Sequence, residues 1–261
     1  PTGQPVVTWA TCSAACPVVT DTRKYVELIA HGDYQRAFEV IRATNPFPSV
    51  CSVVYHHPCE QECRRSEVDA PVALRNLKRF VIDQVGAYRR QTRKRLPIVH
   101  SQSVGIVGGG PAGLSAACAC IEQGYAVTVY DANPEPGGML ANVVPQYRLP
   151  RHYLQEDIAD ILARGIELQS GVRIGKDIDL AELRQRHDAV ILATGLPASR
   201  DLPLENHQHP DVVLGLPFLE SINQGQRQTI PSEVIVIGGG NVAVDVARSA
   251  VRLGADAVKM V

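Results

Sequence analysis

Two glycine-rich segments of the chain carry the residue pattern of a nucleotide-binding loop. The first is Gly108-Gly109-Gly110-Pro111-Ala112-Gly113, which follows the apolar run Val104–Val107 and precedes a segment with helical periodicity. In such a loop the first glycine permits a tight turn, the second lets the backbone approach a pyrophosphate, and the third lets the helix pack closely on the strand. The N-terminus of the helix adds unpaired N–H groups and about half a positive charge. The pattern predicts a bound dinucleotide, with a purely structural glycine turn as the alternative.

An acidic residue stands where this interpretation needs one. Asp131 ends the next expected strand, 23 residues after Gly108. An acid about 20 residues beyond the loop accepts hydrogen bonds from the ribose hydroxyls of the nucleotide. Asp131 is therefore the expected ribose ligand of the first loop.

The second segment is Gly238-Gly239-Gly240-Asn241-Val242-Ala243, which follows the apolar run Glu233–Ile237. Ala243 stands in place of the third glycine, a substitution that the pattern accepts. The residue that would distinguish NAD from NADP is expected beyond Val261, so the sequence leaves the nicotinamide preference open. Two such loops in one chain predict two nucleotides whose reactive rings meet, as in hydride exchange between a flavin and a nicotinamide.

A third candidate site lies in the cysteines near the N-terminus. Four of these cysteines form two pairs with the same spacing, Cys12-x3-Cys16, which is followed by Pro17, and Cys59-x3-Cys63. Four thiolates suit an iron–sulfur cluster or a structural zinc ion, and proline directly after a ligand cysteine is typical of ferredoxin clusters. We expect a cluster, with zinc, unliganded thiols and disulfides as alternatives. Cys51 is a reserve ligand, while Cys118 and Cys120 are expected to be small core residues.

The elements that position these residues change type along the chain. Helical periodicity over 22–30, 33–43 and 72–86 predicts an all-helical first part, and strand and helix signals alternate from Ser103 onward. The expected fold class is α/β, with two dinucleotide-binding (Rossmann-like) units, the second truncated, preceded by an all-helical iron–sulfur domain. The expected domains are 1–100, 101–231 and 232–261. Five basic residues are expected in a solvated helix end or linker, with a patch for an acidic partner as the alternative: Arg89, Arg90, Arg93, Lys94 and Arg95.

Composition excludes several classes of protein. The 261 residues include 26 Lys and Arg against 27 Asp and Glu, a net charge of −1, which does not favour nucleic acid or an anionic membrane as a partner. No apolar run approaches the ~18 residues of a membrane span, and the N-terminus lacks the pattern of a secretory signal. We expect a cytoplasmic chain. Because it begins with Pro1 and not with Met, we also expect it to be processed, trimmed or incompletely represented.

Together these motifs resemble the family of the glutamate synthase small subunit, which includes the N-terminal half of dihydropyrimidine dehydrogenase. The resemblance covers nearly all of the chain. Beyond the two glycine loops it is carried by these segments: Cys12-Ser-Ala-Ala-Cys16-Pro17, Asn45-Pro-Phe-Pro48, His57-Pro-Cys59-Glu-Gln-Glu-Cys63-Arg-Arg65, Pro71-Val-Ala-Leu-Arg-Asn-Leu-Lys-Arg-Phe80, Pro136-Gly-Gly138, Pro145-Gln-Tyr-Arg-Leu-Pro150 and Ala193-Thr194-Gly195.

The resemblance implies a role for each motif. The first unit would bind FAD, with Gly109, Gly110, Pro111 and Ala112 along the pyrophosphate and Asp131 at the adenosine ribose. Gly138, Met139 and Arg148 would lie along the flavin, and the second unit would bind NAD(P)H through Gly239, Gly240, Asn241 and Val242. Arg148 also suits this place on its own chemistry, since a fixed guanidinium fits a phosphate or a negatively charged reduced flavin; a surface salt bridge is its alternative. The protein would be an NAD(P)H-linked FAD oxidoreductase subunit that relays single electrons through a [4Fe–4S] cluster to other redox subunits of a complex. No side chain need act as nucleophile or general acid–base. A non-catalytic relay or docking subunit and a zinc-stabilised interaction module are the rival hypotheses.

Three departures from the family pattern limit these expectations. Residues 1–11 contain no cysteine where two-cluster relatives have a pair, and Tyr55 stands where many relatives have a cysteine. One cluster is therefore expected, on Cys12, Cys16, Cys59 and Cys63, although the family divides those positions between two clusters. Relatives also continue past the nicotinamide unit into a segment that completes the FAD site.

Overall fold

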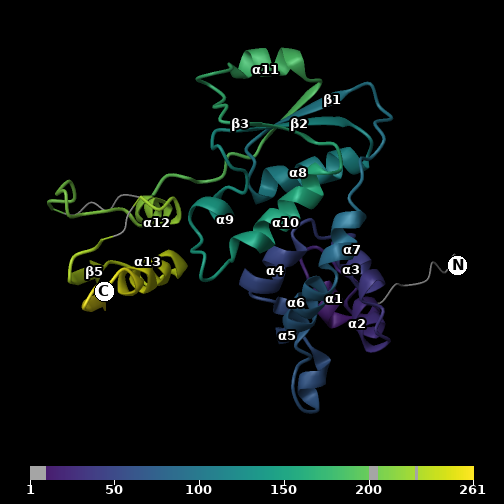
Figure 1. The fold of residues 1–261 in the computed structure, drawn as a ribbon, viewed down its shortest axis with the longest axis horizontal. Coiled ribbons are helices and arrows are strands. Elements are labelled where there is room, and N and C mark those ends of the chain that lie inside the picture. The colour runs from purple at the N-terminus through teal and green to yellow at the C-terminus, as the bar shows by residue number, and fades with distance from the viewer. Residues whose placement is uncertain (1–9, 200–204, 227–228) are drawn as a thin grey trace, which may run out of the picture. The chain divides into compact units, whose positions relative to one another are not determined.

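The computed structural model describes residues 10–199, 205–226 and 229–261, which form two compact units (Figure 1). The first, called here the helical unit, contains the described residues up to Arg95 together with Gln155–Ala163. The second, called here the sheet unit, contains Leu96–Leu154 and the described residues from Arg164 to Val261. The helical first part and the α/β remainder were both predicted from the sequence.

The helical unit buries apolar side chains from short helices, two of which have a side-chain N-cap. Asp21 and Asp33 begin two of them, because each carboxylate accepts a hydrogen bond from the backbone N–H three residues on. Tyr25, Phe38 and Val81 are completely buried in the core. In chain order the elements are α1 (Thr11–Ala14), α2 (Thr22–Ala30), α3 (Tyr34–Arg42), α4 (Pro48–Val54), α5 (Pro58–Gln61), the 3-10 helix η1 (Arg64–Glu67), α6 (Leu74–Gln84) and α7 (Gly86–Gln91).

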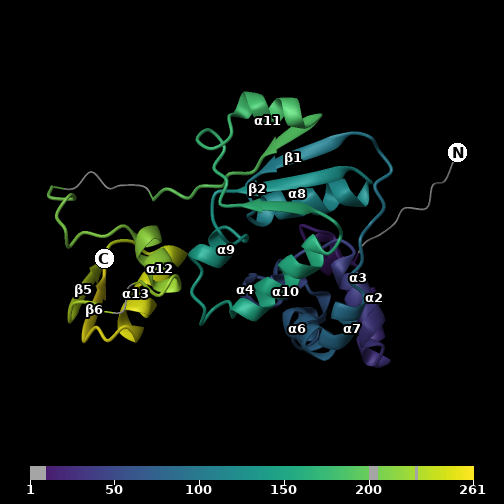
Figure 2. The ribbon, with the colours of Figure 1, turned by 45° about the horizontal axis from the view of Figure 1, so that its top comes forward.

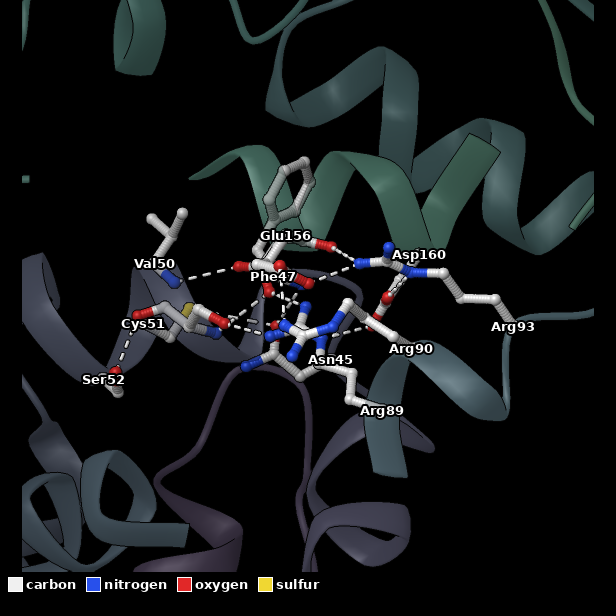
Figure 3. Close-up of polar contacts among 12 residues, drawn as sticks. Asn45, Phe47, Val50, Cys51, Ser52, Arg89, Arg90, Arg93, Glu156 and Asp160 are labelled. Atoms are coloured by element: carbon white, nitrogen blue, oxygen red, sulfur yellow. Dashed lines mark hydrogen bonds and ion pairs between the residues drawn. The ribbon is translucent and has the colours of Figure 1, made fainter. Parts of the chain in front are cut away.

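The expectation of a solvated basic stretch is wrong for Arg89. Its side chain is only 2% exposed and forms ion pairs with Asp157 and Asp160, each at 2.6 Å (Figure 3). Arg93 also reaches Asp160, at 2.7 Å, and pairs with Glu156 at 2.5 Å. Burial alone would lower the pKa of Arg89, but the adjacent carboxylates outweigh it and raise that pKa above its ordinary value. Arg89 and Arg93 are four residues apart in the chain, the same separation as Glu156 and Asp160.

Asp157 also fixes the start of α4. Its two carboxylate oxygens accept the backbone N–H groups of Ser49 (3.2 Å) and Val50 (2.9 Å). Arg89 donates to Ser49 Oγ at 2.6 Å. Since Phe47, the N-cap residue of α4, supplies no capping side chain, a carboxylate 108 positions away in the chain caps this helix. The network therefore holds the segment that carries Cys51.

A four-stranded parallel sheet of strand order β3-β2-β1-β4 forms the centre of the sheet unit. Gly105 in the central strand pairs with Thr128 on one side and Val190 on the other. The strands are β1 (Ser103–Val107), β2 (Ala126–Asp131), β3 (Glu167–Ser170) and β4 (Ala189–Leu192), and the helices are α8 (Pro111–Glu122), α9 (Met139–Asn142) and α11 (Leu180–Arg186). Helix α10 (Arg151–Leu162) begins in the sheet unit, and its residues from Gln155 onward belong to the helical unit. Helices α8 and α11 lie on opposite faces of the sheet (Figures 1 and 2). Both loop-bearing strands were expected, and the parallel pairing agrees with the alternating pattern.

The last part of the sheet unit repeats this plan on a smaller scale. Strands β5 (Glu233–Val236) and β6 (Ala257–Met260) pair in parallel and are connected by α13 (Asn241–Arg252). Helix α12 (Gly215–Asn223) packs against α13, with Phe218 and Leu219 buried beside Val143. The second Rossmann-like unit predicted from the sequence is therefore present as one strand–helix–strand repeat.

Among the described residues, no helix is both long enough and apolar enough to cross a membrane.

Candidate functional site

The first glycine loop joins β1 to α8 and has little room for side chains. Gly108 adopts φ +111°, and a Cβ there would lie 2.3 Å from the carbonyl oxygen of Ala193. A Cβ on Gly113 would lie 1.8 Å from the oxygen of Gly108. Gly110 is the N-cap residue of α8 and Pro111 its first residue, so no side chain caps the helix. The first turn of α8 therefore keeps N–H groups that can face an anion.

Asp131 is attached to this loop. Its Oδ2 accepts the N–H of Gly109 at 2.5 Å, and its Oδ1 accepts the backbone N–H of Asn133 at 2.7 Å and its Nδ2 at 3.0 Å. The side chain is buried at the end of β2. The carboxylate thus lies at the loop, as its ribose role requires. That role itself stays a prediction.

Two further predicted segments meet the same loop. Gly137 donates its N–H to the carbonyl of Gly109 at 2.7 Å, and a Cβ on Gly138 would lie 2.9 Å from the Cα of Gly110. Met139 follows directly as the first residue of α9. On the other side, Thr194 and Gly195 come after β4 and are exposed, and the backbone nitrogen of Thr194 would lie 3.3 Å from a Cβ on Gly108. The structure therefore gathers these residues at one edge of the sheet, the edge where parallel α/β folds bind ligands.

Arg148 is engaged elsewhere. Its guanidinium donates to Asp245 Oδ2 on α13, the helix that follows the second glycine loop. The neighbouring Tyr147 hydroxyl donates to the carbonyl of Asp245 at 3.4 Å, and Arg252 stacks over the Tyr147 ring at 3.8 Å. This ion pair is closer to the salt-bridge alternative than to the flavin role, which no contact in the structure tests.

The second glycine loop is open. Gly238 adopts φ +121° and donates its N–H to the carbonyl of Val261 at 2.7 Å. Cβ atoms added at Gly239 and Gly240 would meet nothing within 4 Å among the described residues. Asn241 and Val242 begin α13 and are exposed. Because Gly240 provides no capping side chain, this helix also begins with N–H groups available to an anion.

The N-terminal cysteines surround two buried tyrosine hydroxyls. Burial, together with nearby Cys59, Cys12 and Cys16, raises the pKa of Tyr25 far above its ordinary value. Burial, Cys16, Cys51 and Cys59 likewise raise the pKa of Tyr55. Neither Tyr25 Oη nor Tyr55 Oη has a hydrogen-bond partner among the described residues. Cys16 and Cys59, both buried, therefore act electrostatically on both hydroxyls.

The other two cysteines of interest occupy different surroundings. Cys51, like Cys16 and Cys59, raises the pKa of Tyr55 by its charge. Its Sγ donates to Asn45 Oδ1 at 3.8 Å. Cys63, the fourth member of the predicted ligand set, accepts the N–H of Val72 at 3.5 Å. The ligand set remains a prediction, and Cys51, the reserve ligand, lies within the group.

These surroundings suit an iron–sulfur cluster. In the described part of the chain, no three His, Cys, Asp or Glu side chains converge closely enough to hold one ion. Tetrahedral zinc needs four ligands at about 2.3 Å from one point when they are thiolates. A [4Fe–4S] cluster binds each thiolate to a different iron and presents several sulfur atoms as acceptors. Two unpartnered hydroxyls beside Cys16 and Cys59 suit such a group.

Comparison with known proteins identifies the relatives of both units. Residues 102–261 match the family described as pyridine nucleotide-disulphide oxidoreductase. The chain belongs to this family. Residues 7–90 match a second family, described as dihydropyrimidine dehydrogenase domain II, 4Fe-4S cluster. The family resemblance predicted from the sequence is confirmed.

Curated relatives of this family align with almost the whole chain. The chain is 37% identical to the NADP(+)-dependent formate dehydrogenase subunit beta of Moorella thermoacetica, covering 100% of this chain and 40% of that protein. It is 39% identical to the NADPH-Fe(3+) oxidoreductase subunit beta of Geobacter sulfurreducens, covering 95% and 38%. It is 38% identical to the NAD-dependent dihydropyrimidine dehydrogenase subunit PreT of Escherichia coli O157:H7, covering 97% and 61%. The chain thus spans about two fifths to three fifths of the length of these relatives.

A solved structure shares the fold. FprA of Mycobacterium tuberculosis, determined in complex with NADPH, is 24% identical and superposes with a TM-score of 0.52, covering 57% of this chain and 36% of that one. At this identity the likeness concerns the fold alone.

Sequence reasoning missed Asp157 and its partners. The signal was present, because Arg89 and Arg93 lie one turn apart and the acids Glu156, Asp157 and Asp160 share a helix with matching spacing. It was missed because the two segments are more than 60 residues apart in the chain.

Proposed function

We propose that this chain is part of an FAD-dependent oxidoreductase subunit that exchanges hydride with NAD(P)H and relays single electrons through a [4Fe–4S] cluster to a partner protein. The carrying observation is the meeting of the first glycine loop with Asp131 and the segment Gly137–Met139 at one sheet edge, in a chain that holds a second such loop. Bound FAD would supply the chemistry, since a flavin accepts two electrons together and passes them on singly.

The residues of the first loop would bind and orient this cofactor. Gly110 and Ala112 would bring backbone against the pyrophosphate at the N-terminus of α8. Asp131 would accept hydrogen bonds from the ribose while it keeps the N–H of Gly109 in place. Gly138 and Met139 would lie along the flavin, because Gly138 already approaches the loop and Met139 follows it directly. Rigid contacts of this kind reduce the entropy lost on binding.

The second loop would bind the nicotinamide nucleotide. Gly239, Gly240, Asn241 and Val242 line an exposed helix N-terminus that can receive a pyrophosphate. The relatives differ in nicotinamide, since two are named for NADP(+) or NADPH and one for NAD. We therefore assign the site to NAD(P)H without a preference between the two.

The cysteine group would hold the cluster in the helical unit. Cys12, Cys16 and Cys59 lie around Tyr25, and Cys63 or the reserve ligand Cys51 would complete the set. Thiolate ligation is favoured at Cys16. Burial raises its thiol pKa, but hydrogen bonds from Thr20 and Val18 lower that pKa by more, so the net shift is downward.

We infer the setting of the protein from its relatives and its charge. The relatives are named as subunits, which supports other redox proteins as partners. The near-neutral net charge of −1 gives no support to nucleic acid as a partner. We propose a cytoplasmic location, and domains at 1–100 (cluster), 101–231 (FAD) and 232–261 (the start of the NAD(P)H-binding domain).

A matched pair of charge insertions tests the assignment of the two nucleotides. Ala112 and Val242 occupy equivalent positions in the two loops, and both are exposed in the first turn of a helix. An aspartate there suits the helix dipole but repels a pyrophosphate. In the full chain, Ala112→Asp is expected to abolish flavin absorbance. Val242→Asp should keep the flavin and its reduction by dithionite, but lose NAD(P)H-driven dye reduction by about a hundredfold.

The outcomes of this test separate the rival assignments. Wild type without flavin absorbance in both aerobic and anaerobic preparations would overturn the proposal. Equal loss of flavin in both variants would show that the loops do not bind separate nucleotides. Far-UV circular dichroism of each variant establishes that the helices are intact.

A further inference from the structure

We propose that Tyr25 and Tyr55 donate hydrogen bonds to sulfur atoms of the cluster and thereby raise its reduction potential. This inference rests on the proposed function, which places a cluster on the cysteine group. It assigns to two side chains a positioning and tuning role in electron relay.

The first observation is that both hydroxyls are buried without a partner. Tyr25 has no exposed surface, and Tyr55 Oη is likewise inaccessible to water. Thr22 lies close enough to lower the pKa of Tyr25, yet no contact of hydrogen-bond distance and angle reaches Tyr25 Oη among the described residues. An unsatisfied buried hydroxyl costs about 1–3 kcal/mol. Such a cost at two positions calls for an acceptor.

The second observation identifies that acceptor. Ser13, between Cys12 and Cys16, accepts the N–H of Thr22 at 3.1 Å, which holds this cysteine segment against the start of α2. The cysteines that act electrostatically on Tyr25 are Cys59, Cys12 and Cys16, and those that act on Tyr55 are Cys16, Cys51 and Cys59. Tyr25 belongs to α2, whereas Tyr55 directly follows α4, so the two tyrosines belong to different elements. Sulfur of a thiolate or of a cluster is a hydrogen-bond acceptor, and each bond that it accepts offsets negative charge.

A cation adds to this effect. Lys78 on α6 lies with its Nζ 5.6 Å from the centre of the Tyr25 ring. Its charge acts on Cys16, Cys51 and Cys59. Reduction adds one negative charge to a cluster, and two hydroxyl donors beside an ammonium group favour the reduced form. The surroundings therefore favour an easily reduced cluster.

The geometry also gives Tyr55 a role suited to its position. Tyr55 directly follows α4, the helix that carries Cys51, and its hydroxyl is subject to the charges of Cys16 and Cys59 as well. A neutral phenol there cannot replace a thiolate ligand without losing its proton. As a donor, however, it satisfies both its own hydroxyl and a sulfur of the cluster.

Isosteric removal of each hydroxyl tests the proposal. Tyr25→Phe and Tyr55→Phe, made in the full chain and purified anaerobically, are expected to retain iron and sulfide. At a fixed solution potential, the ratio of reduced to oxidised cluster should fall about tenfold in each, a shift of about 59 mV for one electron. The measurement is a redox titration monitored by the electron paramagnetic resonance of the reduced cluster.

Tyr88→Phe is the matched control. It removes a hydroxyl from the same unit, but one that already donates to Glu39 Oε1 at 3.0 Å. Its midpoint potential should equal that of wild type. A second measurement reads the bond itself, because exchange into D2O should alter the proton hyperfine couplings of the reduced cluster in wild type and remove fewer couplings in each phenylalanine variant.

Each outcome decides the proposal. Unchanged potentials with intact clusters would overturn this inference and leave the proposed function standing. Loss of iron from Tyr55→Phe alone would overturn it in favour of Tyr55 as a ligand. Absence of iron and acid-labile sulfide from anaerobic wild type would overturn the relay function and this inference together.

Discussion

The two glycine loops are similar in sequence and backbone but differ in what surrounds them. Gly108 and Gly238 have φ of +111° and +121°, so both require the left-handed region that favours glycine. A Cβ at Gly108 would collide with the carbonyl of Ala193 at 2.3 Å, whereas at Gly238 the nearest atom is Ala243 Cβ at 3.7 Å. The same motif is thus sterically enclosed in the first loop and open in the second.

The difference shows that two separate requirements select glycine in such loops. The turn itself demands a positive φ, and this demand is local, so it recurs in both loops. Close approach of neighbouring backbone is a second demand, and it arises only where β4 and Asp131 border the loop. Tolerance of substitution should therefore separate the two demands.

The largest expected effect comes from one substitution made at both positions. Gly108→Ala should lower the free energy of unfolding by about 3 kcal/mol or more, since backbone strain of about 1–3 kcal/mol adds to a collision with a carbonyl that cannot rotate away. Gly238→Ala carries the strain alone and should cost about 1–3 kcal/mol. Urea denaturation of the full chain, followed by circular dichroism, measures both.

One further variant is a control for backbone strain alone. Gly225→Ala places the same substitution at φ +71° with no atom within 4 Å, so it reports backbone strain in a loop outside both sites. Equal costs at Gly108 and Gly238 would contradict the comparison, because the collision would then contribute nothing.

A smaller effect is expected from the ion pair that links the segments behind the loops. Arg148 lies near the first loop in sequence, and Asp245 belongs to the helix that follows the second. Asp245 is buried and its Oδ1 has no hydrogen-bond partner among the described residues, so removal of Arg148 leaves an unpaired carboxylate. A double-mutant cycle of Arg148→Gln and Asp245→Asn should give a coupling of about 1 kcal/mol in the free energy of unfolding.

This cycle also decides between the two roles of Arg148. Coupling without change in flavin content would assign the residue to the ion pair. Loss of flavin in Arg148→Gln without coupling to Asp245 would instead support the position along the flavin that the family resemblance implies. Arg151→Gln is a nearby control, since its guanidinium donates to the carbonyl of Leu140 at 3.4 Å.

Local patterns were sufficient to predict most of the fold. The strand before each loop, the helix after it and the Asp131 strand follow from periodicity and glycine spacing, which act over fewer than about 30 residues. Arg89 could not be placed in this way, because its burial depends on Asp157 and Asp160 in a distant helix. A run of basic residues is usually solvated, and only the folded chain reveals which of them meet buried acids.

The same contrast between local pattern and distant contact applies to the candidate sites. The glycines and Asp131 were predictable because each has a backbone role that its residue type implies. The tyrosines beside the cysteines were not, since a tyrosine in a helical pattern is ordinarily a core residue. Their unpartnered hydroxyls became visible only when Tyr25 and Tyr55 were placed among the thiols.

The smallest expected effect is a pH dependence confined to the four-stranded sheet that carries the first glycine loop. His187 packs on Gly105 of β1, and a Cβ added to Gly105 would lie 2.6 Å from His187 Cδ2. In the strand before the second loop, the residue equivalent to Gly105 is Ile235, which is 69% exposed. His187 Nε2 contacts the Tyr130 hydroxyl at 2.9 Å and its Nδ1 the Ser103 hydroxyl at 3.2 Å. Burial lowers the pKa of His187, and this outweighs the carboxylates of Glu167 and Asp188.

The lowered pKa of His187 in the folded chain determines whether stability rises or falls with pH. Because the folded chain binds the proton less readily than the unfolded chain, the contribution of His187 to stability is full above the ordinary His pKa of about 6.5 and is lost as the pH falls through the lower folded pKa. The free energy of unfolding should therefore fall between pH 7.5 and 5.5, and this fall should be smaller in His187→Gln. His152→Gln, which removes an exposed imidazole, should retain the wild-type difference. If the two variants behave alike, the neutral His187 is not part of what distinguishes the first sheet from the second.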